Sequence, residues 1–234
     1  MKKLLCKCAS ITRDFIKNNP HVWWALFAPV FVAAFLLAER FIVYSDYWVS
    51  YIPLDDKIPF VPQFVVFYYL WFPTLFFPGL NMMLRDGPAF RRYILTLCIG
   101  FVGTLAFCIV FPNGQDLRPA ALESGFFHEL VRGIYSADTN TNVLPSMHVL
   151  GVIAVLAGII DSKTTRKWWI IAGMSVLTSL ICSSTVLIKQ HSILDVFAGI
   201  AYGLVVVSIV YALAPFIARR VRAGKAGRAS GGKE

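Results

Sequence analysis

The sequence predicts an all-α polytopic membrane protein, a bundle of six transmembrane helices with a short N-terminal interfacial helix. Three observations predict it. Hydrophobic residues make up 57% and charged residues 15% of the 234 positions, a balance that soluble domains of this size do not show. The apolar residues lie in long runs, and about 20 residues suffice to cross the hydrocarbon core of a bilayer. The cationic residues gather at alternate ends of these runs.

Six apolar runs define the expected domain organisation. They cover residues 22–44, 63–84, 93–111, 147–160, 168–188 and 193–217. The fourth run is short, so we expect its helix to begin in the segment that precedes it. The chain is therefore expected to consist of a cytoplasmic amphipathic segment (1–21), a membrane domain with the six spans (22–217) and a basic cytoplasmic tail (218–234).

The segments around the first spans have recognisable patterns. Over residues 3–17, apolar side chains recur at helical spacing among lysines and arginines, as in a helix that lies in the headgroup layer. A signal peptide fits poorly, because the first apolar run starts late and is too long. The aromatic loop 45–62 is expected at the outer surface. In the second run, Pro73 and Pro78 predict a bend.

The longest polar segment, residues 113–144, is expected to be an outer loop with a role of its own. Its middle, residues 120–134, is amphipathic enough to form a surface helix. Such a helix could guide a lipid toward a site, or the segment could be a plain covering loop. The fifth and sixth runs are separated by few residues, which predicts a tight hairpin at the outer face.

The net charge of +9 could indicate nucleic acid binding, so the positions of the cations decide. Cations concentrate in residues 2–17, 85–92, 163–167 and 219–228, while acidic residues dominate the other loops. By the positive-inside rule, both termini are cytoplasmic. The basic character thus predicts topology and contact with anionic lipid, with no nucleic acid partner. We expect a multi-pass protein of the cell's inner or plasma membrane.

Two polar stretches, residues 135–151 and 189–195, each place a histidine where a loop meets an apolar run. His191 and Asp195 are four residues apart, so on a helix they share one face and the carboxylate can reach the imidazole. That contact would fix the tautomer and leave the other ring nitrogen free as a nucleophile. A purely structural hydrogen bond between the two explains the spacing equally well.

Ser146 and His148 follow Pro145 at the start of the fourth run, where a helix N-terminus can receive a phosphate. Ser146 could donate a hydrogen bond to a phosphate oxygen, and His148 could protonate a departing alkoxide. A serine and a histidine that cap a helix are the simpler alternative. Phosphate also needs cations. Arg118 and Lys189 are the candidates, with Arg132 behind them, and a solvated loop charge is the alternative for each.

These motifs carry a resemblance. Pro145-Ser146-Met147-His148 resembles the Pro-Ser-x-His motif, and His191 with Asp195 the His-x-x-x-Asp motif, of the type 2 phosphatidic acid phosphatase superfamily of membrane lipid phosphatases and phosphotransferases. The resemblance implies that His191 is a nucleophile that becomes phosphohistidine, that Asp195 supports it, and that His148 acts first as an acid and then as a base.

The resemblance has a finer level and two departures. Tyr135, Asp138 and Asn142 are similar to the branch with inositol phosphotransferases and sphingolipid head-group synthases, which makes Asp138 and Asn142 expected substrate-binding residues. Arg118-Pro119 matches the end of the family's Lys-x6-Arg-Pro motif, but Phe111 occupies the lysine position. Ser184, another expected substrate-binding residue, is followed by threonine where the family has arginine. We expect Lys189 to replace one missing cation.

The resulting expectation is a lipid phosphatase that cleaves a lipid phosphoester at the extracytoplasmic face. The alternative is a head-group phosphotransferase that passes the group to an alcohol or inositol-type acceptor from the same site. A proton-coupled transporter is the alternative of another class, although it predicts charges in mid-span and those here lie at span ends. No metal or other cofactor is expected, because no cluster of carboxylates or cysteines accompanies the site.

Overall fold

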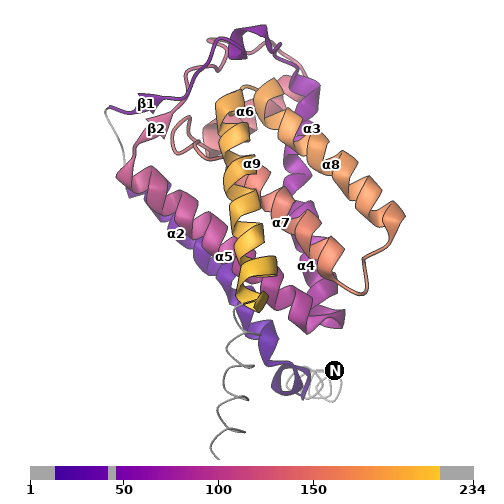
Figure 1. Ribbon diagram of the computed structural model, residues 1–234. Helices are drawn as coiled ribbons and strands as arrows, with labels where there is room; N and C mark the ends of the chain where they lie inside the picture. The colour runs from indigo at the N-terminus through magenta and orange to yellow at the C-terminus, as the bar shows by residue number, and fades with distance from the viewer. Residues whose placement is uncertain (1–13, 42–45, 217–234) are drawn as a thin grey trace, which may run out of the picture.

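The computed structural model describes residues 14–41 and 46–216 (Figure 1). Residues 14–18 are helical, but most of the expected interfacial helix and the whole expected basic tail lie outside the described residues. The helices are η1 (Pro20–Leu26), α2 (Phe27–Phe41), η2 (Asp55–Lys57), η3 (Pro62–Phe64), α3 (Val65–Tyr69), α4 (Trp71–Arg85), α5 (Gly87–Val110), α6 (Phe126–Ala137), α7 (Met147–Asp161), α8 (Trp168–Leu187), α9 (Ile193–Ser208) and the π-helical turn η4 (Ile209–Leu213).

Five stretches of the described chain are long and apolar enough to cross a membrane: Pro20–Phe41, Pro62–Arg85, Gly87–Val110, Trp168–Leu187 and Ile193–Phe216. They correspond to five of the six expected spans. The remaining one, α7, has only 15 residues, or about 22 Å at 1.5 Å per residue. By length alone, α7 does not confirm the expected fourth span.

The short helix α7 lies at the centre of the bundle. It packs against α4, α5, α8 and α9, so protein surrounds it (Figure 1). Eight of its residues are buried: Val149, Leu150, Gly151, Val152, Ala154, Val155, Gly158 and Ile159. Non-helical backbone is tolerated at membrane depth where protein covers it. The loop that precedes α7 brings polar groups to the start of this buried helix.

The second and third spans differ in detail from those expected from the sequence. The third span begins at Gly87 because Asp86 caps it, accepting a hydrogen bond from the Ala89 backbone N–H at 3.3 Å. The second span is divided into α3 and α4 at Leu70. Pro73 lies in the first turn of α4, where a missing N–H costs no helical hydrogen bond. The structure thus has a break shortly before Pro73, whereas Pro78 lies inside α4.

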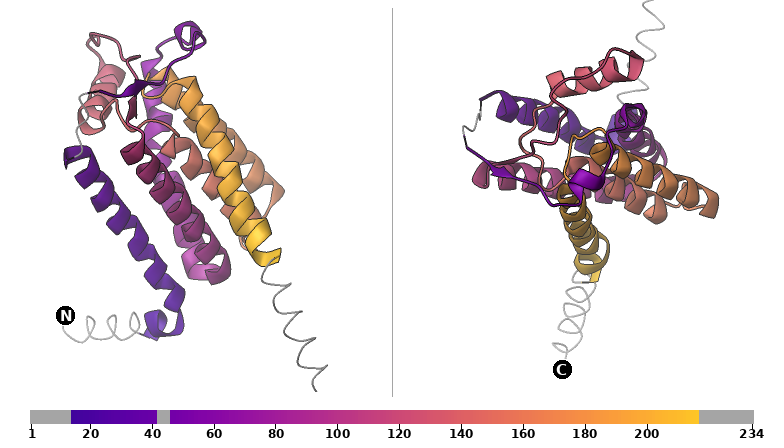
Figure 2. Two further views of the ribbon diagram at one scale, coloured as in Figure 1. Left: turned by 60° about the vertical axis from the view of Figure 1, so that its left-hand side comes forward. Right: turned by 90° about the horizontal axis from the view of Figure 1, so that it is seen from above.

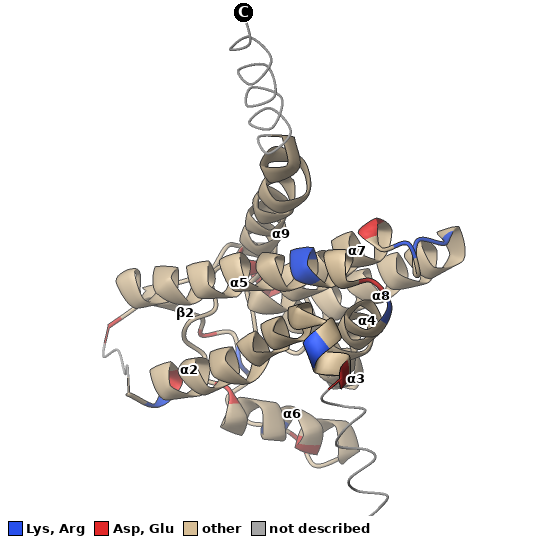
Figure 3. Cartoon of the chain, turned by 90° about the horizontal axis from the view of Figure 1, so that it is seen from below, with Lys and Arg blue, Asp and Glu red and all other residues tan. Residues whose placement is uncertain are grey.

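The two ends of the bundle differ in structure and charge. One end carries α6 and a two-residue parallel pair between β1 (Trp48–Val49) and β2 (Asn113–Gly114), a small departure from the expected all-α fold (Figures 1 and 2). The opposite, basic end carries the loops between α4 and α5 and between α7 and α8 (Figure 3). There Arg92 pairs with Asp161 at 2.6 Å and joins α5 to α7.

Candidate active site

His191 lies just outside α9, not on its face as the spacing predicted. Ser192 caps α9, and its side chain and that of Asp195 form a capping box that fixes the helix start. The backbone N–H of His191 donates to the carbonyl of Thr185 at 3.0 Å. Asp195 reaches back, and its Oδ2 lies 3.3 Å from His191 Nδ1. The expected contact therefore exists, but a helix cap creates it.

Asp195 is fully buried, and both of its carboxylate oxygens are engaged. Oδ2 also accepts the backbone N–H of Ser192 at 2.9 Å. Oδ1 accepts the hydroxyl of Ser50 at 2.5 Å. These bonds hold the carboxylate against Nδ1 of His191, which leaves Nε2 as the ring nitrogen available for chemistry.

Ser146 and His148 come to the same place from α7. Ser146 caps α7, and its Oγ lies 3.4 Å from His191 Nε2. Its backbone N–H donates to the carbonyl of Asp195 at 3.1 Å. Gly199 makes this approach possible, because a Cβ there would lie 2.9 Å from the Ser146 carbonyl oxygen. The N-terminal turns of α7 and α9 therefore meet at the site.

The two motif histidines face each other with ring centroids 5.8 Å apart and an interplanar angle of 64°. The His148 ring also lies 4.3 Å from the Tyr68 ring and 4.6 Å from the Trp71 ring. Trp71 donates its indole N–H to the His148 carbonyl at 2.9 Å. Among the described residues, no side chain or backbone group forms a hydrogen bond with the His148 imidazole, so its nitrogens remain available to a ligand.

Both expected phosphate-binding cations are engaged by backbone carbonyls. The ammonium of Lys189 donates to the carbonyls of Asp55 at 2.8 Å and Ile58 at 2.6 Å. Burial lowers the pKa of Lys189, against the opposing effect of Asp55. The backbone of Lys189 is in the left-handed region (φ 55°), as in a turn. The two hydrogen bonds of its ammonium group anchor this turn to η2 and the residue that follows it. The structure does not bring it to His191's cavity.

Arg118 is closer to the site, but its guanidinium is likewise engaged in hydrogen bonds within the protein. Its Nη2 donates to the carbonyls of Asp138 at 2.8 Å and Thr139 at 2.7 Å, and to Gln190 Oε1 at 2.8 Å. The guanidinium also lies 4.3 Å from the centre of the Tyr135 ring. Burial lowers its pKa. Arg118 therefore fixes the loop that carries Asp138. The third candidate, Arg132, pairs with Glu129 on the exposed side of α6.

The other three expected substrate-binding residues have different surroundings. Asp138 lines the same cavity as the histidines, and burial raises the pKa of its carboxyl. Asn142 also lines it, and donates to Glu39 Oε1 of α2 at 2.5 Å. Ser184 is fully buried and donates to the carbonyl of Ile181 in its own helix at 2.6 Å. It satisfies its hydrogen bond within α8 and does not line the cavity.

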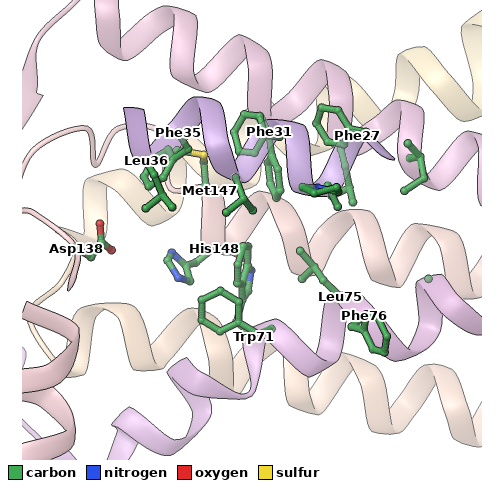
Figure 4. A pocket seen from close by; sticks show the side chains of 18 of the residues that line it. Phe27, Phe31, Phe35, Leu36, Trp71, Leu75, Phe76, Asp138, Met147 and His148 are labelled. Carbon is green, nitrogen blue, oxygen red and sulfur yellow. The ribbon is translucent and has the colours of Figure 1, made fainter. Parts of the chain in front are cut away.

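A large apolar cavity of about 690 Å³ begins at the histidines and runs between α2, α4 and α5 (Figure 4). His148, His191, Asp138 and Gln190 lie at its polar end. Its walls are hydrophobic and aromatic, and include Phe27, Phe31, Phe35, Leu36, Leu75, Phe76, Met83 and Phe90. No Lys or Arg of the described residues lines it. This apolar cavity is suited to a ligand with a polar head and a hydrocarbon body.

Several residues of the site were not predicted. Ser50 supports Asp195, Tyr68 and Trp71 flank His148, and Gln190 links Asp138 to Arg118. Gln190 directly precedes His191, and this position in the sequence could have identified it as a residue of the site. Tyr68 and Trp71 lie in an apolar run that favours a bilayer-facing role, and nothing in the sequence connects Ser50 to Asp195.

Comparisons with known proteins add little. A scan against protein-family models and a search of curated proteins found no match. A search of solved structures found the crystal structure of Aquifex aeolicus LpxE, with 20% sequence identity, a TM-score of 0.46 and coverage of 69% of this chain and 87% of that one. At this level of likeness, we base the functional assignment on the geometry of the site.

Proposed function

We propose that the protein is an integral-membrane enzyme that cleaves a lipid phosphoester through a phosphohistidine at His191. The observation that carries the proposal is the position of His191. Its Nδ1 lies against a buried carboxylate, and its Nε2 lies beside Ser146. The ring centroid of His148 lies 5.8 Å from that of His191, at the polar end of the apolar cavity. This combination provides a nucleophile, a proton donor and a place for a lipid.

In the first step, the lone pair of His191 Nε2 attacks phosphorus, and the P–O bond to the lipid alcohol breaks with its electron pair on oxygen. His148 in its imidazolium form gives that oxygen a proton. Asp195 stabilises the positive charge that develops on the His191 ring. In the second step, the oxygen of a water molecule attacks phosphorus while neutral His148 takes a proton from that water. The N–P bond electrons then return to Nε2, and both histidines regain their starting state.

The lipid character of the substrate is inferred from the apolar cavity. Along α4, its wall extends from Trp71 to Met83, which is about 18 Å at 1.5 Å per residue. A hydrocarbon chain can lie along such a wall, with its ester oxygen near His148. Burial of that chain removes apolar surface from other lipids, not from water. The cavity therefore serves mainly to position the substrate.

The second step can use a hydroxyl instead of water. In that case the enzyme is a head-group phosphotransferase with an alcohol or inositol-type acceptor. One observation favours this candidate, namely the lack of Lys and Arg among the described lining residues. Hydrolysis requires fewer components, and we keep it as the first assignment. No cofactor takes part in either route as proposed.

We assign the reaction to the extracytoplasmic face, because the site lies toward the end of the bundle that carries α6 and the cationic loops lie at the opposite end. The α6 end would then be the outer end. Both termini would then be cytoplasmic. In sealed vesicles, added lipid should be cleaved only when the outer end faces the medium, and detergent should remove this difference. Equal cleavage by vesicles of both orientations would contradict the assignment.

The proposal is tested with purified protein and radiolabelled lipids, by following free phosphate and new lipid products separately. His191→Ala and His148→Ala should each lower turnover by roughly 10²-fold or more. His128→Ala is the matched control, since His128 lies on α6 outside the apolar cavity, and should retain turnover. Full turnover by His191→Ala would overturn the proposal. Proton-coupled solute flux without any lipid turnover would favour the transporter.

A further inference from the structure

We propose that Asp55, in the loop before the second span, is a positioning residue for the nucleophile His191. The inference rests on the proposed function and concerns a residue outside every motif on which the resemblance depends. Asp55 does not line the apolar cavity, so it acts on His191 through other residues. Two features support this role: Asp55 bonds to the chain on both sides of His191, and a chain of hydrogen bonds joins its carboxylate to the His191 ring.

The Asp55 carboxylate is buried, with 1% of the residue exposed, and both of its oxygens accept hydrogen bonds. Its Oδ1 accepts the backbone N–H of Ile193 at 2.8 Å. Its Oδ2 accepts the hydroxyl of Ser192 at 2.7 Å and the backbone N–H of Ile52 at 2.9 Å. A buried carboxylate requires such partners, because its removal from water is costly. Two of the three donors belong to the residues that directly follow His191.

The backbone carbonyl of Asp55 holds the chain on the other side of His191. It accepts a hydrogen bond from the ammonium of Lys189 at 2.8 Å, and the carbonyl of Ile58 accepts one at 2.6 Å. Lys189 precedes His191 by two residues. The turn that carries His191 is thus bonded to Asp55 both before and after the histidine. In this arrangement, Lys189 anchors the turn of the nucleophile and does not bind phosphate.

Ser192 connects Asp55 to the carboxylate beside His191. Its hydroxyl donates to Asp55 Oδ2 at 2.7 Å, and its backbone N–H donates to Asp195 Oδ2 at 2.9 Å. The same oxygen of Asp195 lies 3.3 Å from His191 Nδ1. A continuous chain of contacts therefore runs from Asp55 through Ser192 and Asp195 to the His191 ring. A displacement of Ser192 reaches the carboxylate that selects the tautomer of His191.

The loop that carries Asp55 is bonded to the bundle at two further points. The Ser50 hydroxyl donates to Asp195 Oδ1 at 2.5 Å, and the Val61 backbone N–H donates to the carbonyl of Leu187 at 2.8 Å. These two contacts lie on either side of Asp55 in the chain. Asp55 therefore belongs to an anchored surface, against which the turn between α8 and α9 is held in place.

The test compares Asp55→Asn with Asp56→Asn. The two substitutions remove the same charge from adjacent residues, but Asp56 is exposed and accepts its hydrogen bond from the hydroxyl of Tyr51. An amide cannot accept hydrogen bonds at both positions as the Asp55 carboxylate does. With a short-chain lipid, Asp55→Asn should lower kcat by roughly 10- to 100-fold and change KM less than threefold, because the nucleophile is misplaced while the cavity is intact. Asp56→Asn should retain the wild-type values.

The tautomer of His191 distinguishes positioning from a general loss of stability. The chain has four histidines, so the NMR signals of protein with ¹⁵N-labelled histidine can be assigned by substituting them singly. At a pH where the ring is neutral, wild-type His191 should carry its proton on Nδ1. Asp55→Asn should mix the two tautomers of His191 and leave the signals of His128 on α6 unchanged. This measurement needs no turnover.

Lys189→Met removes the anchor on the other side of His191 and leaves the Asp55 carboxylate in place. We expect kcat to fall by roughly 3- to 10-fold with little change in KM, because the carboxylate still holds Ser192 and Ile193. A raised KM with an unchanged kcat would show that Lys189 binds the substrate phosphate, and would overturn its role as an anchor.

Wild-type kcat in Asp55→Asn, or a lowered kcat with an unmixed His191 tautomer, would overturn the inference and leave the proposed function standing. An equal loss in Asp56→Asn would also overturn it, because the charge of the loop would then be the cause. If the wild type cleaves no phosphoester lipid, the proposed function fails, and the tautomer alone tests the role of Asp55.

Ser192→Ala replaces Asp55→Asn if the latter does not fold, as judged by size-exclusion chromatography. This variant loses the hydroxyl that donates to Asp55 and keeps the backbone N–H that donates to Asp195. The tautomers of His191 should again be mixed. A single tautomer, the same as in the wild type, would overturn the inference.

Discussion

Asp195 connects His191 to the rest of the site through three hydrogen bonds to its two oxygens. The contact with His191 was predictable from a spacing of four residues. The way in which Asp195 reaches His191 was not predictable, since the sequence suggested a shared helix face and the structure uses the capping box of α9. Ser50 was not predictable at all, because it lies 145 residues from Asp195 in the chain. Local patterns thus identified the pair but not its support.

Asp195→Asn tests the role of this carboxylate. An amide cannot accept hydrogen bonds at both positions as the carboxylate does, and it has no negative charge to favour the Nδ1–H tautomer of His191 or to stabilise positive charge on its ring. We expect the His191 tautomer to become mixed and kcat to fall by about 10²- to 10⁴-fold, with KM changing little. Steady-state kinetics with a short-chain lipid measure both quantities.

Ser50→Ala is the graded comparison for that substitution. It removes one bond to Asp195 and leaves the carboxylate charge in place, so we expect a loss of roughly 10- to 100-fold in kcat. A kcat for Asp195→Asn within threefold of the wild-type value would show that the carboxylate is only structural.

At the level of helices, the site depends on the close crossing of α7 and α9 at Gly199. A Cβ at this position would lie 2.9 Å from the carbonyl oxygen of Ser146 and 3.0 Å from the Cβ of Val149. Backbone atoms cannot rotate away as a flexible side chain can. The sequence predicted both helices and their polar N-termini, but not this crossing, because helix periodicity does not specify a partner helix.

Gly199→Ala should therefore push the N-terminal turns of α7 and α9 apart and separate Ser146 from His191. We expect activity to fall at least tenfold, because misplacement by a few tenths of an ångström or more weakens the alignment of the reacting groups. Gly173→Ala in α8 is the matched control, since a Cβ there meets no atom within 4 Å.

Both substitutions gain about 0.8–1 kcal/mol of intrinsic helix propensity, so only packing distinguishes them. Activity and thermal stability are measured for both proteins. Activity equal to that of the wild type in Gly199→Ala would contradict the proposed importance of the crossing.

For the whole molecule, the pattern of apolar runs and charges predicted a helical membrane protein, the hairpin of α8 and α9, and six spans, of which five correspond to stretches long enough to span. They could not predict that α7 occupies the centre of the bundle, since a buried and a lipid-facing apolar helix have similar sequences. For the same reason, the apolar cavity between α2, α4 and α5 was not predictable. The motif histidines were identified from the sequence, whereas most of the residues that contact them could be found only from the fold.

The central claim is that phosphorus becomes covalently bonded to His191. The most direct measurement uses a lipid analogue with a nitrophenyl leaving group, which departs without a proton from His148. With the His148→Ala protein, the first step should proceed and the second should stall. Mass spectrometry of the quenched protein should then find one phosphoryl-derived adduct on His191, labile in acid, and none in the double variant that also carries His191→Ala. Nitrophenol release without this adduct, or an adduct on another residue, would contradict the account.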